Sequence, residues 1–194
     1  MTALSELKRH LRPGQVYRRA DLAHRSNAVD RHLQQLLADG TLNKVSRGLY
    51  SCPKQASFGE VPPEDEKLVS AFLKSDDFLM FSPNQYNSLG VGATQLYNTV
   101  YVYNRKRHGR YKLGNREYEF KVKPYFPKKL DESFLLVDLL NNVDRLAEDK
   151  HLLLEKSKRA VERVGVSAFK KAADTYGKVG TKKLVSAMLS EARQ

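Results

Sequence analysis

The sequence lacks the residues on which several classes of protein depend. Among 194 residues it has one cysteine, Cys52, and no tryptophan. A single thiol forms neither an internal disulfide nor a thiolate zinc site, which excludes a small disulfide-stabilised fold. The five histidines show no spacing typical of metal ligands, so we expect no metal and no other cofactor.

Long apolar runs are also missing. None approaches the roughly 20 residues that a membrane-spanning helix needs. The N-terminal segment MTALSELKRHLR is amphipathic and too charged for the apolar region of a signal peptide. We therefore expect a cytoplasmic protein with no membrane partner. The sequence contains no phosphate-binding loop, dinucleotide fingerprint or nucleophile elbow, so it does not predict an enzyme.

Positive charge is what the sequence has in excess. The 34 Lys and Arg residues against 22 Asp and Glu give a formal net charge of +12. Residues 1–56 carry 10 basic and 4 acidic side chains, residues 57–100 carry 2 and 6, and residues 101–130 carry 10 and 2. Such blocks predict basic surface patches. Because basic proteins bind polyanions by releasing their counterions, nucleic acid is the expected partner.

Helical patterns fill most of the first 40 residues. Leucines at helical spacing predict a helix over residues 3–11, and a shorter helix over residues 19–23 follows a short strand at residues 16 and 17. A third helix is predicted over residues 27–38, where apolar residues at i, i+4, i+7 and i+8 form one stripe.

The third helix carries the residues that we expect to contact DNA. Its polar face offers side chains that pair with base edges, and its N-terminus suits a phosphate. Ser26 is the predicted N-cap, and Gly40 suits the left-handed position that ends a helix. The alternative is an ordinary amphipathic helix with a solvated polar face. The expected contacts are Arg25, Ser26, Asn27, Arg31, Gln34 and Gln35.

A hairpin with a basic turn follows this helix. Residues 41–45 alternate as a strand does, Arg47 and Gly48 form a turn, and residues 49–51 return. On DNA, Arg47 would enter a minor groove, where the negative potential is strongest, with Lys44 beside it. Three helices followed by a basic hairpin predict a winged helix-turn-helix over residues 1–56.

The same junction resembles a known family. Its motif residues are Asp39-Gly40, Leu42 and Arg47-Gly48-Leu49-Tyr50, and those of the middle of the chain are Asn87-Ser88-Leu89-Gly90 and Thr94-Gln95. In these stretches the sequence is similar to the AbiEi family, the antitoxins and autorepressors of bacterial type IV toxin–antitoxin, or abortive-infection, systems. The resemblance implies a repressor that binds double-stranded DNA at its own promoter, where inverted repeats are candidate sites. It also implies an antitoxin that opposes a nucleotidyltransferase toxin, without requiring a stable complex.

The rest of the chain predicts a second domain. Residues 53–63 combine proline and glycine with little apolar content, which indicates a linker, and residues 57–194 form the domain. The expected elements are a helix after Pro63, strands at 78–81 and 97–103, a hairpin turning at Gly114-Asn115, and helices from Ser133 onward. The predicted fold class is thus α+β: an N-terminal winged helix-turn-helix, then a mixed domain with a small antiparallel sheet and a C-terminal cluster of helices.

The second basic block falls on this hairpin. Alternation predicts that Tyr118, Phe120 and Val122 face inward, while the charged residues between them face outward. Aromatic residues among cations can stack nucleobases, which makes RNA a candidate partner, and a solvated outer face is the alternative. The predicted second basic surface comprises Arg105, Lys106, Arg107, Arg110, Lys112, Lys121 and Lys123.

One pattern on this hairpin suggests an enzyme. Glu119 and Lys121 match the acid-x-lysine strand of metal-dependent nucleases, with Asp76 or Asp77 as a further acid. Carboxylates would hold Mg²⁺ and the lysine would position water. Alternating charges on an exposed strand explain the same pattern. The sequence favours an autorepressor and antitoxin, with a winged-helix nuclease and a ligand-sensing regulator as the alternatives.

Overall fold

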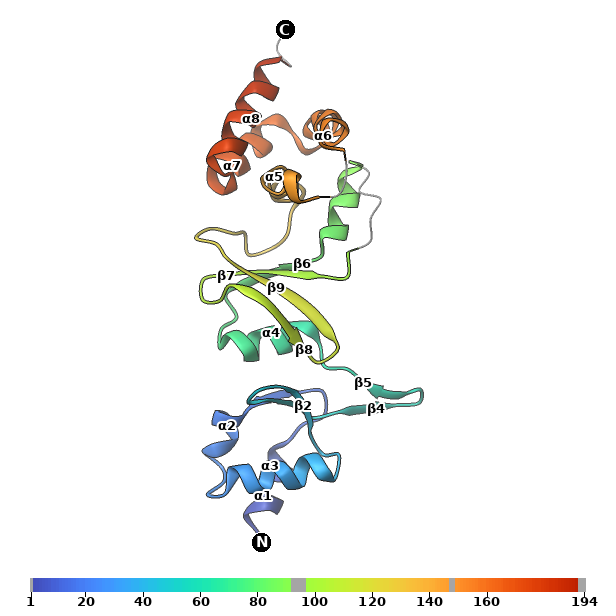
Figure 1. Cartoon of the computed structure of the whole chain (residues 1–194), viewed down its shortest axis with the longest axis vertical. Coiled ribbons are helices and arrows are strands. Elements are labelled where there is room, and N and C mark those ends of the chain that lie inside the picture. Colours follow the sequence, from blue (N-terminus) through green and yellow to red (C-terminus); the bar gives the residue numbers. More distant parts are fainter. Residues whose placement is uncertain (1, 92–96, 147–148, 192–194) are drawn as a thin grey trace. The chain divides into compact units, whose positions relative to one another are not determined.

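The structure is a computed structural model that describes residues 2–91, 97–146 and 149–191 (Figure 1). It is a mixed α+β structure with small antiparallel sheets and C-terminal helices, as predicted. The chain forms two compact units. The first contains Met1–Asp77 and Gly109–Tyr118, and the second contains Phe78–His108 and Glu119–Gln194. The Thr94-Gln95 pair lies outside the described residues.

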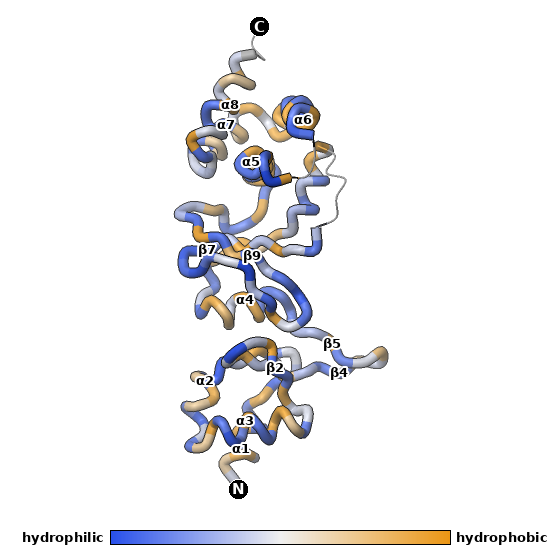
Figure 2. Tube along the Cα trace, viewed as in Figure 1, coloured by the Kyte–Doolittle hydropathy of each residue, from blue (hydrophilic) through white to orange (hydrophobic). Residues whose placement is uncertain are grey.

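The first unit begins with three helices and a three-stranded sheet. The helices are α1 (Ala3–His10), α2 (Arg19–Ala23) and α3 (Val29–Ala38). The strands β1 (Val16–Arg18), β2 (Asn43–Ser46) and β3 (Leu49–Ser51) pair antiparallel in the order β1-β3-β2. Apolar and hydrophilic residues alternate along α3, as Figure 2 shows. Its apolar stripe packs with those of α1 and α2, and Leu7 and Leu36 are completely buried there.

Two glycines confirm the predicted end of α3 and the predicted turn. Gly40 has φ +73° and Gly48 has φ +71°, a left-handed conformation that L side chains rarely adopt. The predicted N-cap was wrong, because α3 begins at Val29 with Ala28 as its N-cap. The Ser26 hydroxyl instead accepts from the Ala28 N–H at 3.2 Å and hydrogen bonds with His32 at 2.7 Å, so it holds the turn before the helix.

The predicted linker contains a hairpin. Strands β4 (Lys54–Ala56) and β5 (Gly59–Val61) pair antiparallel, with Ser57 and Phe58 at the turn. The prolines that suggested a linker flank this hairpin instead of interrupting it, since Pro53 precedes β4 and Pro62 follows β5.

A helix and a second hairpin complete the first unit. Helix α4 (Asp65–Leu73) packs against the hairpin formed by β8 (Gly109–Leu113) and β9 (Arg116–Val122). The rings of Phe72 and Tyr111 lie 4.9 Å apart, and the Tyr118 hydroxyl donates to Asp65 at 2.7 Å. The Gly114 N–H donates to the Val45 carbonyl at 3.2 Å, so the turn of this hairpin also contacts β2.

The second unit packs strands under helices. A four-stranded sheet has the order β6-β7-β9-β8, in which β6 (Phe78–Phe81) and β7 (Val100–Asn104) belong wholly to this unit. Its helices are a 3-10 helix at Pro83–Leu89, α5 (Glu132–Asn141), α6 (Lys150–Val164), α7 (Val166–Tyr176) and α8 (Val179–Glu191). Every residue of α5 from Phe134 to Asn141 is buried, so this helix forms the centre of the core.

The predicted burial pattern of β9 is confirmed only in part. Tyr118 and Phe120 are completely buried, as predicted. The prediction for the end of the strand was wrong: Val122 is 48% exposed, whereas Lys121 is only 6% exposed. Both faces of β9 are therefore covered near Lys121, which the alternation of a single strand does not reveal.

Candidate nucleic-acid interface

The polar face of α3 lies in solvent. Arg31, Gln34 and Gln35 are exposed, whereas Leu33 and Leu36 on the opposite face are buried in the core of the first unit. All three exposed side chains have hydrogen-bonding groups that can pair with base edges in a major groove. The sequence-predicted residues of this face are therefore available to a ligand.

An acidic residue on the same helix is neutralised. Asp30 is exposed at the start of α3, where it would repel a phosphate. Two nitrogens of the Arg19 guanidinium donate to its two carboxylate oxygens, at 2.7 and 2.6 Å. These hydrogen bonds lower the pKa of Asp30, which therefore stays charged and paired.

Arg19 also joins α3 to the β2–β3 hairpin. Its backbone N–H donates to the Gly48 carbonyl at 2.9 Å, while its side chain holds Asp30. One residue at the start of α2 thus fixes both the helix and the turn. Sequence reasoning missed this role, because no local pattern links Arg19 with an acid eleven residues later.

The residues before α3 have mixed surroundings. Asn27 is exposed, and Ser26 is half-buried beside His32. Arg25 is exposed, and its guanidinium donates to the His10 ring at 2.6 Å. That bond ties Arg25 to α1, so a phosphate contact would have to share or replace it.

The β2–β3 hairpin presents two basic side chains. Arg47 and Lys44 are both exposed, and Arg47 occupies the turn with Gly48. Within the first unit, the structure therefore exposes every predicted DNA contact except Ser26.

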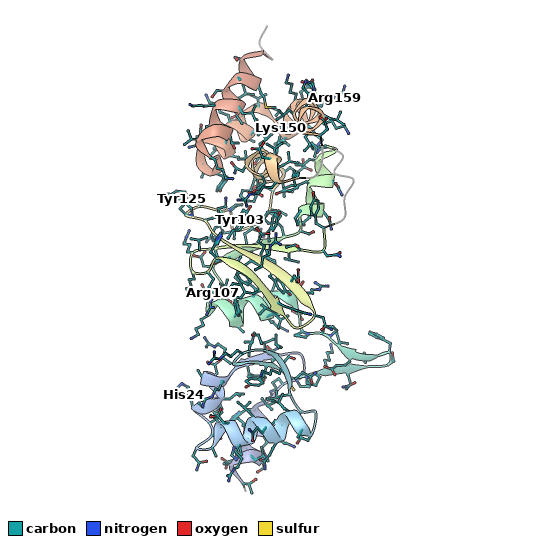
Figure 3. The ribbon with its side chains drawn as sticks, in the orientation of Figure 1. His24, Tyr103, Arg107, Tyr125, Lys150 and Arg159 are labelled. Atoms are coloured by element: carbon teal, nitrogen blue, oxygen red, sulfur yellow. The ribbon has the colours of Figure 1, made fainter. Side chains whose placement is uncertain are left out.

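The second predicted basic surface is divided. Arg110 and Lys112 are exposed on β8 and belong to the first unit. In the second unit, Arg105, Lys106 and Arg107 lie exposed in the loop after β7, and Figure 3 labels Arg107.

Asn104 fixes the shape of that loop. Its buried side-chain oxygen accepts from the backbone N–H groups of Lys106 and Arg107, at 2.8 and 2.7 Å. Its amide nitrogen donates to the carbonyls of Val102 and Arg107, at 3.1 and 3.0 Å. The loop therefore holds its basic side chains on an ordered backbone. We refer to Arg105, Lys106 and Arg107 as the basic loop.

The core of the second unit contains a buried acid. Asp138 of α5 is 1% exposed and accepts from the hydroxyls of Tyr86 and Tyr103, at 2.6 and 2.7 Å. Figure 3 shows Tyr103 between the sheet and α5. The pKa of Asp138 is raised because burial disfavours the charged carboxylate, although both tyrosines oppose this effect. Sequence reasoning missed Asp138, an acid within an otherwise apolar run.

Two lysines, Lys121 in β9 and Lys123 just after it, lie near this acid. The ammonium of Lys121 lies 3.4 Å from the centroid of the Tyr101 ring and 3.4 Å from a Glu119 oxygen. The Lys123 ammonium lies 5.1 Å from the centroid of Tyr103. Burial lowers the pKa of both lysines. The charges of Glu119 and then Asp138 partly offset this effect for Lys121, and the charge of Asp138 does so for Lys123. Lys121 is buried and Lys123 is half-buried, and both contact tyrosine rings of the core. The prediction that they belong to an outer basic surface was therefore wrong for Lys121 and holds only in part for Lys123.

Three residues of the proposed acid-x-lysine site already form contacts within the protein. Lys121 pairs with Glu119, and Asp76 accepts from the Ser70 hydroxyl at 2.5 Å. Over the described residues, no group of three or more His, Cys, Asp and Glu side chains is placed to hold a metal ion.

No protein-family model and no curated protein sequence matches this chain. In the part of the chain that the structure describes, no α-helix combines the length and the apolar character that crossing a bilayer requires.

Proposed function

We propose that residues 1–56 form a winged helix-turn-helix that binds double-stranded DNA, and that the protein represses transcription from its own promoter. In this proposal α3 is the recognition helix and the β2–β3 hairpin is the wing. The helix reads base edges from the major groove, and Arg47 contacts the adjacent minor groove.

The observation that carries the proposal is the polar face of α3. Arg31, Gln34 and Gln35 are exposed together, and the one acid beside them, Asp30, is neutralised by Arg19. This pairing offsets the repulsion that the carboxylate of Asp30 would otherwise exert on a nearby phosphate, so the face can approach a polyanion.

DNA binding is tested with the purified full chain. The probes are the duplex directly upstream of its gene and a scrambled duplex of the same composition. We expect tighter binding to the upstream duplex and a steep fall of affinity with salt. Equal affinity for both duplexes would contradict the proposal that the protein is a repressor of this promoter. No binding at low salt would contradict the proposal that it binds DNA.

The antitoxin function rests on the AbiEi resemblance. Its motif residues Gly40 and Gly48 have positive φ, and Leu42 and Leu49 are buried, so these positions maintain the helix–hairpin junction. The conformation of these residues supports the junction that we propose for the first 56 residues, and the antitoxin function rests on the resemblance alone.

In this proposal the second unit protects the cell from a nucleotidyltransferase toxin. The basic loop is the candidate surface, and RNA is a candidate partner there because the loop is cationic and exposed. The test is co-expression with a nucleotidyltransferase encoded beside this gene. Survival supports the antitoxin function. Growth arrest despite normal repression of the promoter would favour the ligand-sensing regulator instead.

A further inference from the structure

The β4–β5 hairpin extends from the first unit as an arm (Figure 1). It comprises residues 54–61, and we refer to it as the arm. Its strands pair only with each other, and most of its residues are exposed. Isolated two-stranded hairpins are marginally stable in water, so an arm of three-residue strands gains little from its own contacts.

The tip of the arm carries an aromatic ring. Phe58 is 85% exposed, the largest exposed fraction among the large apolar side chains of the described residues. Figure 2 shows the tip as an apolar end on hydrophilic strands. Ser57 and Gly59 flank the ring, so little bulk surrounds it. The arm therefore presents one narrow apolar wedge.

The arm carries one charged residue of each sign. Glu60 accepts from the side-chain amide of Asn43 in β2, which holds its carboxylate against the sheet. Lys54, the other charged residue, is exposed on β4. Lys54 pairs with Val61 at the base of the arm, whereas Glu60 pairs with Gln55, one residue nearer the turn. Both side chains are exposed, so the charges of the strands balance and the aromatic tip is what distinguishes the arm.

We infer that the arm enters the minor groove of bound DNA and inserts Phe58 between two base pairs. This inference rests on the proposed DNA binding and adds to it a partner for the arm and a deformation of the duplex. Apolar wedges, phenylalanine among them, unstack base steps from the minor groove and kink the duplex. A single ring on small neighbours suits the gap between two base pairs.

The alternative occupant, a second copy of this chain, fits less well. A stable protein interface buries about 1,200–2,000 Å² in total, whereas one phenylalanine contributes roughly 150–250 Å². The remaining residues of the arm are small or polar and add little apolar area. Insertion between two base pairs, by contrast, requires only one aromatic ring.

The absence of tryptophan gives a direct test. Phe58→Trp would carry the sole tryptophan of the protein, and Tyr125→Trp is a matched control because Tyr125 is 65% exposed in the second unit. Each variant is titrated with the duplex from directly upstream of the gene. We expect the fluorescence of Phe58→Trp to be quenched and protected from acrylamide, because its indole stacks on bases, while the fluorescence of Tyr125→Trp is unchanged.

A second variant measures the energetic and structural effect. Phe58→Ala should weaken binding about tenfold, as is usual when a ring stacked on a base is removed. It should also reduce the bend of the duplex, measured by energy transfer between dyes at the duplex ends. Phe58→Leu, which keeps an apolar wedge, should restore most of the bend.

Each outcome separates the two levels of the hypothesis. If the wild type binds the duplex while the fluorescence of Phe58→Trp stays unquenched, or Phe58→Ala keeps the full bend, the arm inference is wrong and the DNA-binding proposal stands. If the wild type does not bind DNA, both are wrong. If the indole of Phe58→Trp becomes protected as protein concentration rises without DNA, and sedimentation shows a dimer, the occupant is a second copy and the inference is overturned.

Discussion

The ammonium nitrogen of Lys121 lies 3.4 Å from the centroid of the Tyr101 ring, in the interior of the second unit. A lysine in this position is held by the negative face of the ring and by Glu119 rather than by water. The basic sequence around β9 is therefore not uniformly a surface for polyanions. Part of its charge stabilises the fold.

Removing that charge should destabilise the protein. Lys121→Ala removes the ion pair with Glu119 and the contact with the Tyr101 ring, so we expect a loss of about 2 kcal/mol in the free energy of unfolding. DNA affinity should not change. Urea unfolding and a binding titration measure the two effects. Unchanged stability with weakened nucleic-acid binding would instead place Lys121 on a functional surface.

Asp138 should make stability depend on pH. Burial raises its pKa above the 3.8 of an ordinary aspartate, so the folded protein binds the proton more tightly than the unfolded chain does. Between these two pKa values the folded state carries more protons. The free energy of unfolding therefore falls as pH rises from about 3.8 through the folded pKa, and the contribution is complete only at lower pH.

Asp138→Asn removes this titration and still offers hydrogen-bonding groups to Tyr86 and Tyr103. We expect the variant to gain stability relative to the parent as pH rises, measured by urea unfolding over about pH 4–8. Equal differences at every pH would show that Asp138 does not titrate in this range.

Arg31 on α3 should determine sequence preference. Arg31→Ala should cost about 1–3 kcal/mol on the upstream duplex and much less on a scrambled one, as expected for a side chain that contacts a base edge. The control is Lys8→Ala, since Lys8 pairs with Asp39 at 2.5 Å and is not among the predicted contacts. An equal loss on both duplexes would mean that Arg31 touches only the phosphate backbone.

Arg47 at the turn should act through charge. Arg47→Ala should weaken binding to most sequences and reduce the slope of log affinity against log salt by about one unit. The measurement is a salt series on the upstream duplex, with circular dichroism to verify the fold. If the slope is unchanged, the turn does not contact DNA.

The basic loop should protect cells without being needed for repression. Replacing Arg105, Lys106, Arg107 and the exposed Arg110 with serine should abolish protection from the toxin and leave promoter repression near normal. Changes to exposed charges usually cost within about 0.5 kcal/mol each, so the fold should persist.

A matched variant tests whether the loop must be ordered. Asn104→Ala keeps all four charges but removes the bonds that hold the loop backbone. Partial loss of protection in this variant would show that placement matters as well as charge. Full protection by the quadruple variant would exclude an electrostatic action of this surface.

Local features were predictable from the sequence. Gly40 and Gly48 determine their own backbone conformation, and the apolar stripe of α3 is read directly from its spacing. The capping position failed because Ser26 has His32 as a partner, six residues later. Such a contact depends on a turn that the sequence pattern does not specify.

The interior of the second unit was less predictable. Whether Lys121 or Val122 is buried depends on what covers each face of β9, and Lys121 lies against Tyr101 of β7. The role of Asp138 depends on Tyr86, 52 residues away in the chain. Contacts of this length are set by tertiary packing, so periodicity alone does not reveal them.

The hairpin whose Gly114 bonds to Val45 has a consequence for how this gene can change. Residues 109–118 belong to the first unit, yet they are inserted between two segments of the second. A single recombination event near residue 77 would therefore exchange one unit while separating it from its own hairpin. Exchanging the whole first unit together with its hairpin requires crossovers at three places, near residues 77, 108 and 118. If α3 is the recognition helix that we propose, its sequence preference would therefore change more readily by point substitution on α3 than by exchange of the unit.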